Sequence, residues 1–143
     1  KEVIDKLRNK ARPYLFSNNI LPAVAAVGIK VLDMILESKY LIKKLADNTA
    51  YFRTKMVEAG FDVRDAKGVH PVVPVMLGDA ILASKFAKEM VESEGIYVIA
   101  FSFPVVPKNE ARIRVQISAS HDRDQLDKAI AAFVKVGKKL EVI

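Results

Sequence analysis

The feature that most constrains the fold is a long apolar stripe with helical spacing, which begins at Pro22 and runs toward Gly60. Proline suits the first turn of a helix, and glycine suits the position just past its end. A helix of about 35 residues is long for a globular protein, so we expect a kink or break near residues 38–40. The stripe should pack against a core or another subunit. Its members recur every three or four residues and are Val24, Val27, Val31, Ile35, Ser38, Ile42, Leu45, Thr49, Phe52 and Met56.

Shorter elements surround this stripe. Val3, Ile4 and Leu7 predict an opening helix that ends at Pro13, and the turn-forming stretch "RPYLFSNN" that follows is predicted to be irregular. Three β-rich runs, at residues 70–78, 96–103 and 112–119, predict strands.

Two further helices are expected between and after the strands. Asp79 should cap a helix that runs to about Ser93 and is closed by Gly95. Asp122 and Gln125 have the spacing of a capping box, which predicts a final helix to about Lys139. The order of elements predicts an α+β fold, with helices on a small, mainly antiparallel sheet, preceded by the long helix.

Composition excludes several classes of function. The 143 residues contain no cysteine and two histidines, so thiol chemistry and a histidine-rich metal site are excluded, and we expect no metal. The net charge of +6 comes from lysines interleaved with acidic residues, so no nucleic-acid partner is expected. No apolar run reaches the length of a membrane span, and no signal-peptide layout is present. His121 is expected to serve only as a hydrogen-bonding group at a strand end.

Two stretches carry candidate binding groups. In "ARIRVQISASH", alternation places Arg112 and Arg114 on one strand face and Ile113 on the other. The pattern alone favours a solvated strand face, and the alternative is an arginine that grips a carboxylate or phosphate. In "RPYLFSNN", Ser17 and Asn18 precede a helix that starts with proline, where they could cap the helix or donate to a phosphate.

Three motifs together, "RPYLFSNNILPAV", "VVPVMLGDA" and "FSFPVVPKNEARIRVQISASH", resemble the C-terminal part of the α-oxoamine synthases over the whole chain. The resemblance implies a pyridoxal 5'-phosphate enzyme of the fold-type I transferases. It also implies a homodimer with shared active sites. Residues 61–143 would form the C-terminal small domain, and residues 1–60 the end of the large-domain region with the long connecting helix.

The resemblance also implies roles for single residues. Ser17 and Asn18 match positions that contact the cofactor phosphate bound in the partner subunit, and Arg114 matches the position that binds the substrate carboxylate. Arg112 matches a position without such a role. Asn109 stands where glycine is common, but asparagine tolerates a left-handed backbone. We expect no catalytic residue in this chain, because the lysine that forms the Schiff base would lie upstream of residue 1.

Within the family, the motifs look like those of the member that condenses glycine with acetyl-CoA to give 2-amino-3-ketobutyrate and CoA. The chain opens without methionine, so we expect a piece of a longer protein that is inactive alone. The alternatives are a sister synthase that forms 8-amino-7-oxononanoate or 5-aminolevulinate, and a non-enzymatic module that binds a small ligand or dimerises. The expected location is the cytoplasm, or the mitochondrion for a eukaryotic homologue.

Overall fold

The computed structural model describes residues 1–65 and 68–143, which form two compact units, Lys1–Lys39 and Tyr40–Ile143. The first unit contains α1 (Glu2–Lys10), α2 (Arg12–Leu15) and α3 (Pro22–Glu37). The opening helix ends at Lys10, before Pro13, and residues 16–19 are irregular as predicted. The prediction was wrong for Arg12–Leu15, which form α2, because Pro13 lies in its first turn, where a missing N–H costs no helical hydrogen bond.

The long apolar stripe is divided between two helices, which confirms the break expected near residues 38–40. Helix α3 ends at Glu37, Ser38 is extended with φ −136°, and α4 spans Tyr40–Glu58. The two halves of the stripe differ in burial. Phe52 and Met56 in α4 are fully buried, whereas the apolar side chains of α3 are exposed.

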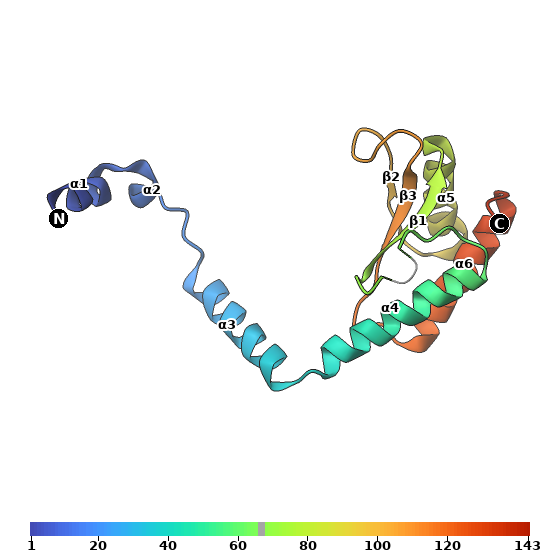
Figure 1. Ribbon diagram of the computed structural model, residues 1–143, viewed down its shortest axis with the longest axis horizontal. Helices are drawn as coiled ribbons and strands as arrows, with labels where there is room; N and C mark the ends of the chain where they lie inside the picture. Colours follow the sequence, from blue (N-terminus) through green and yellow to red (C-terminus); the bar gives the residue numbers. More distant parts are fainter. Residues whose placement is uncertain (66–67) are drawn as a thin grey trace. The chain divides into compact units, whose positions relative to one another are not determined.

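The second unit is an α+β layer, as predicted. It contains α4, β1 (Val72–Gly78), α5 (Ala80–Glu94), β2 (Ala100–Phe101), β3 (Ala111–Gln116) and α6 (Arg123–Lys139). The three strands are antiparallel in the order β1-β3-β2 (Figure 1). Since α4 packs on α6, it belongs to this unit. The domain boundary expected between residues 60 and 61 stays a prediction.

The predicted helix ends are confirmed. The Asp79 side chain accepts a hydrogen bond from the Leu82 N–H, and Gly95 closes α5 in the left-handed conformation with φ +68°. Asp122 and Gln125 form the complete capping box at the start of α6. These local signals set where α5 begins and ends and where α6 begins.

A single core fills the space between the helices and one face of the sheet. Phe133 of α6 lies at its centre and contacts three other phenylalanine rings at centroid distances of 5.5–6.2 Å. Core side chains of the second unit are Phe52, Met56, Phe61, Val63, Val73, Val75, Phe86, Met90, Ile113, Ile117, Leu126, Ala132, Phe133 and Val136. In the described part of the chain, no helix is both long enough and apolar enough to cross a membrane.

Candidate functional site

Strand β3 presents its two arginines on the sheet face opposite the core. Ile113, between them, is fully buried, whereas Arg114 is exposed and Arg112 is partly buried. On the neighbouring strand β1, Pro74 is the partner of Arg114 and Met76 is the partner of Arg112. The predicted alternation of faces is therefore confirmed.

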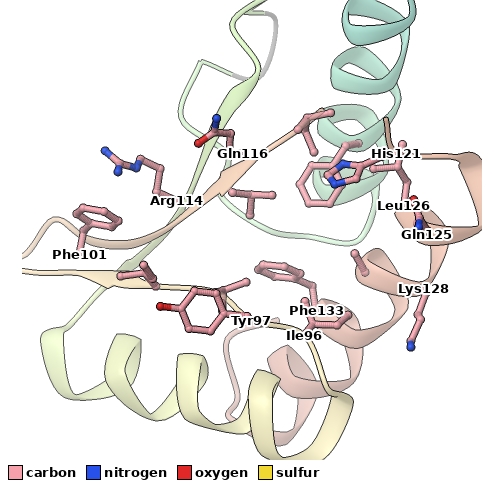
Figure 2. A pocket seen from close by; sticks show the side chains of 16 residues that line it. Ile96, Tyr97, Phe101, Arg114, Gln116, His121, Gln125, Leu126, Lys128 and Phe133 are labelled. Atoms are coloured by element: carbon pink, nitrogen blue, oxygen red, sulfur yellow. The ribbon is translucent and has the colours of Figure 1, made fainter. Parts of the chain in front are cut away.

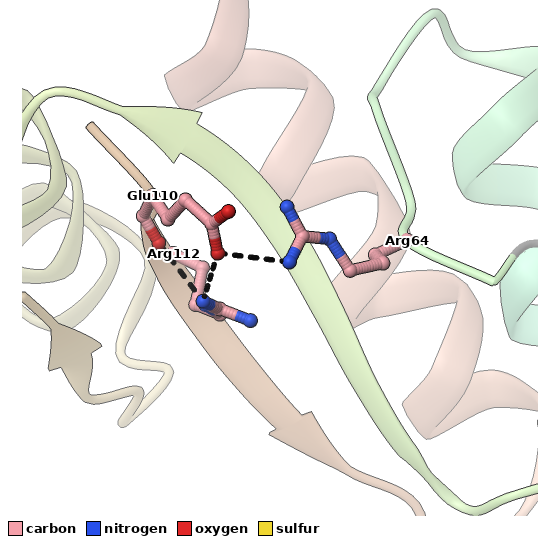
Figure 3. Close-up of polar contacts among 3 residues, drawn as sticks. All are labelled: Arg64, Glu110 and Arg112. Atoms are coloured by element: carbon pink, nitrogen blue, oxygen red, sulfur yellow. Dashed lines mark hydrogen bonds and ion pairs between the residues drawn. The ribbon is translucent and has the colours of Figure 1, made fainter. Parts of the chain in front are cut away.

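Arg112 is occupied by a structural ion pair. Its Nη2 lies 2.9 Å from Glu110 Oε2, and its Nε donates a 3.0 Å hydrogen bond to the Glu110 carbonyl. Arg64 Nη1 donates to the same Glu110 oxygen at 2.9 Å, so one carboxylate joins two guanidinium groups (Figure 3). The hydrogen bond from Arg64, followed by the positive charges of both arginines, holds the pKa of Glu110 below its ordinary value.

Arg114 has a different environment. Among residues 1–65 and 68–143, no ion pair or hydrogen bond of its guanidinium is found. Instead, its guanidinium carbon lies 4.1 Å from the centre of the Phe101 ring (Figure 2). Arg114 thus combines an exposed, rigid donor fork with the absence of a neighbouring carboxylate in the described residues. These are the properties needed to bind an external carboxylate.

A cavity of about 580 Å³ lies beside Arg114, between the sheet and α6 (Figure 2). Residues 96–99 line it, and among the described residues the run predicted as a strand over 96–103 pairs with β3 at Ala100 and Phe101 alone. The expected full-length strand was wrong: residues 96–99 have no strand structure. Phe52 and Phe133 lie on the apolar side of the cavity, and His121, Gln125 and Lys128 contribute polar atoms. A volume of this size is typical of a small-molecule site.

His121 is fixed at the edge of this cavity by the turn after β3. Its Nδ1 accepts a 3.2 Å hydrogen bond from the Ser118 N–H. The buried Asn48 side chain of α4 donates to the carbonyl oxygens of Ser118 and His121, at 3.1 and 2.9 Å. The expectation that His121 acts as a hydrogen-bonding group at a strand end is confirmed.

Ser17 and Asn18 lie in the first unit, in the exposed segment between α2 and α3. Asn18 is left-handed with φ +49°. Neither residue caps α3, because Leu21 is its N-cap and no side chain hydrogen bonds there. The capping interpretation is therefore wrong. Nor does either side chain make a hydrogen bond with any residue that the structure describes. A hydroxyl and an amide with unused donors match the acceptor oxygens of a phosphate.

Other details bear on the predicted site. Asn109, before β3, has φ +63°, so asparagine takes the left-handed conformation expected at this position. No cluster of three or more potential metal ligands occurs in the described ranges 1–65 and 68–143. The interpretation from sequence missed Glu110 and Phe101, the residues that give Arg112 and Arg114 their different environments.

Comparisons with known proteins find relatives that match nearly the whole chain. It is 50% identical over all 143 residues to 2-amino-3-ketobutyrate coenzyme A ligase of Escherichia coli, of which it covers 35%. It is 51% identical over 136 residues, 95% of the chain, to the mitochondrial ligase of Mus musculus, of which it covers 32%. It is also 47% identical over 143 residues to 8-amino-7-oxononanoate synthase of Thermosipho melanesiensis, of which it covers 36%. The chain thus spans about a third of the length of these relatives.

Solved structures share the fold at low sequence identity. Serine palmitoyltransferase of Sphingomonas wittichii matches 98% of this chain and 35% of its own, with a TM-score of 0.83 and 22% identity. A high-resolution structure of SPT with PLP matches 98% of this chain and 35% of its own, with a TM-score of 0.86 and 23% identity. The fold-type I architecture expected from the sequence is confirmed.

A family model completes the comparison. The model described as aminotransferase class I and II matches residues 1–133, a range that includes Ser17, Asn18 and Arg114. The chain therefore belongs to the aminotransferase class I and II family.

Proposed function

We propose that this chain is part of a pyridoxal 5'-phosphate-dependent acyltransferase that condenses glycine with acetyl-CoA to give 2-amino-3-ketobutyrate and free CoA. It would act in threonine and glycine metabolism. The observation that carries the proposal is the exposed Arg114, without an acidic partner in the described residues, in a chain 50% identical to a 2-amino-3-ketobutyrate coenzyme A ligase. The cytoplasm, or the mitochondrion in a eukaryote, is the proposed location, and the mitochondrial name of the mouse relative supports the second.

Arg114 would bind the carboxylate of glycine through its two-pronged donor edge. The product 2-amino-3-ketobutyrate keeps that carboxylate, so the same contact can persist from substrate to product. Holding the carboxylate fixes the orientation of the α carbon, and a positioned reactant reacts faster than a freely rotating one. The role of Arg114 is therefore orientation and not proton transfer, because a guanidinium stays protonated.

Ser17 and Asn18 would hold the phosphate of the cofactor, because their hydroxyl and amide groups are exposed donors. Pyridoxal phosphate, when bound, supplies an electron sink for negative charge on the α carbon of the amino acid. We further propose a homodimer in which this contact crosses to the partner's cofactor. The exposed apolar side chains of α3, such as Leu36 at 80%, support packing against a further protein surface.

The test is steady-state kinetics of the complete enzyme with Arg114→Ala and Arg114→Lys, varying both substrates. Loss of a charge-assisted pair commonly costs about 2–5 kcal/mol, a factor of roughly thirty to several thousand. We expect the KM for glycine to rise by such a factor in Arg114→Ala and by less in Arg114→Lys. The KM for acetyl-CoA should change little. An unchanged KM for glycine in both variants would refute the proposed role of Arg114.

A second candidate is a sister synthase, favoured by the 47% identity to 8-amino-7-oxononanoate synthase over the full chain. Assays of glycine, alanine and serine with a series of acyl-CoAs separate the two activities. A non-enzymatic ligand-binding module is tested on the 143-residue chain itself. We expect pyridoxal phosphate and borohydride to leave no cofactor fixed on it, and fixation on one specific lysine would show that the chain carries its own cofactor lysine.

A further inference from the structure

We propose that Phe101 is a positioning residue for Arg114, with its aromatic ring holding the guanidinium in the orientation that receives the amino-acid carboxylate. This inference rests on the proposed function of Arg114. It adds a residue on a different strand, β2, to the site. The contact is direct, with 4.1 Å between the guanidinium carbon of Arg114 and the centre of the Phe101 ring (Figure 2).

The register of the sheet creates this contact. Phe101 of β2 is the direct partner of Arg112 on β3, which makes it the diagonal neighbour of Arg114 on the same face. Diagonal neighbours on adjacent strands lie within reach of each other when one is aromatic and the other is long. In the described chain, β2 pairs with β3 only through Ala100 and Phe101. The short strand is therefore sufficient to fix the backbone of Phe101 against β3.

Competition for the ring is removed by Glu110. Arg112, directly opposite Phe101, would be an equally suitable cation for the ring, but Glu110 holds its guanidinium at 2.9 Å. The ring is thus left to Arg114, whose guanidinium is a planar group with all its N–H bonds in that plane. A ring 4.1 Å from the guanidinium carbon restrains the cation without accepting its N–H hydrogen bonds, which stay available to a carboxylate.

The ring also restrains the Arg114 side chain, which the other described residues of the site do not. Arg114 is exposed, and a long exposed side chain samples many rotamers. No carboxylate or carbonyl among residues 1–65 and 68–143 restrains its guanidinium. An acidic neighbour would restrain it but would compete with the substrate for the same donors. An aromatic ring restrains the cation without occupying its hydrogen bonds, which suits a group that must bind an external anion.

The experiment is substrate kinetics of the complete enzyme with Phe101→Leu, Phe101→Tyr and the matched control Phe103→Leu. We expect Phe101→Leu to raise the KM for glycine by about threefold to thirtyfold, the range of a cation–π contact. The KM for acetyl-CoA should be unchanged. Phe101→Tyr should have the wild-type KM for glycine, because tyrosine keeps the aromatic ring. Phe103→Leu should have no effect, since the exposed Phe103 ring contacts Lys108 and not Arg114.

Two further variants distinguish positioning from folding and from failure of the proposed function. A site-specifically fluorinated phenylalanine at position 101 keeps the ring shape and weakens its negative face, so the KM for glycine should rise without loss of folded enzyme. In an Arg114→Ala background, Phe101→Leu should add no further defect. If Arg114→Ala impairs glycine binding while Phe101→Leu and the fluorinated ring do not, the inference on Phe101 is wrong and the proposed function stands. If Arg114→Ala leaves the KM for glycine unchanged, the proposed role of Arg114 is refuted, and the inference on Phe101 falls with it.

Discussion

Glu110 forms an ion pair with Arg112, which lies two residues further along the chain, and 2.9 Å separates Glu110 Oε2 from Arg112 Nη2. Arg64 reaches the same oxygen from the loop after α4, at 2.9 Å. Arg112 and Arg114 share a strand face, yet this carboxylate uses only the first of them. Their expected functional difference therefore has a physical cause that is independent of any relative.

Arg112→Ala should leave glycine use nearly intact in the complete enzyme. The guanidinium of Arg112 is bound to Glu110 and is not available to the substrate. The KM for glycine should therefore change by a factor of about two, which corresponds to the ~0.5 kcal/mol typical of a change outside the site. The lost ion pair should lower the free energy of unfolding by about 0.2–1 kcal/mol. Kinetics and urea denaturation beside Arg114→Ala measure both effects. A large rise in the KM for glycine in Arg112→Ala, with none in Arg114→Ala, would move the carboxylate site to Arg112.

The Glu110 cluster should make stability depend on acid pH. Its pKa is lowered in the folded state, chiefly by the hydrogen bond from Arg64, so folding favours the ionised form. The resulting stabilisation is fully present above the ordinary glutamate value of 4.5 and is lost as pH falls through the lower folded value. The advantage of wild type over Glu110→Gln in urea denaturation should thus shrink below pH 4.5.

A matched control for this pH series is Glu92→Gln in α5, whose carboxylate lies 3.8 Å from Lys88 and is well exposed. We expect the difference between wild type and Glu92→Gln to be small at every pH. If the Glu110→Gln difference instead stays constant from pH 7 to pH 3, the ion pair does not contribute to the acid dependence.

Local signals in the sequence predicted much of the fold. The capping box of Asp122 and Gln125 and the cap at Asp79 depend on residues three positions apart, and both helices begin where expected. The break between α3 and α4 followed from the improbable length of one continuous helix. Alternation also placed Arg112 and Arg114 on one face, because side-chain period along a strand is independent of its partner.

Features that depend on pairing distant segments could not be predicted. β-Branched and aromatic residues over 96–103 fit a strand, but only the register with β3 decides that residues 96–99 separate from it and border a cavity. The Arg64–Glu110 contact joins residues 46 positions apart. For the same reason, no sequence pattern distinguished the ring under Arg114 from an ordinary strand aromatic. The roles of Ser17 and Asn18 depend on a bound group, so residue patterns left them open.

Ser17→Ala should weaken cofactor binding more than it slows catalysis at saturating cofactor. A hydrogen bond to a charged phosphate contributes roughly 1.5–3 kcal/mol, so the Kd for pyridoxal phosphate should rise about tenfold to a hundredfold. Fluorescence titration of the complete enzyme measures the Kd. Asn19→Ala, one position past the predicted pair, is a neighbouring control.

Mixed dimers test whether the Ser17 contact crosses between subunits. One subunit carries Ser17→Ala, and the other carries a tag and a wild-type serine. The proposed shared site predicts that the wild-type subunit's cofactor is the one bound weakly. A defect confined to the mutated subunit's own cofactor would contradict sharing.

Arg53 in α4 is a buried cation that binds backbone carbonyls of the segment before β1. It is 2% exposed, and its guanidinium donates to four carbonyl oxygens, at 2.6–3.3 Å. These acceptors belong to Arg64, Asp65, His70 and Val72. Arg53 thus fixes both flanks of the loop that brings Arg64 toward Glu110.

Replacing Arg53 should loosen this loop without touching Arg114. Each hydrogen bond to a charged group is worth about 1.5–3 kcal/mol, so Arg53→Met should reduce the local free energy of opening by at least ~3 kcal/mol. Amide exchange at Arg64 and Met76, which hydrogen bond to the carbonyls of Pro74 and Asp62 at 3.2 and 2.8 Å, should then be about a hundredfold faster. Arg53→Lys should give a smaller effect, because one ammonium cannot reach all four oxygens. Lys55→Met, an exposed change on the same helix, should leave both amides unchanged. Wild-type exchange rates in Arg53→Met would show that the backbone pairing of this loop, and not the buried cation, holds it in place.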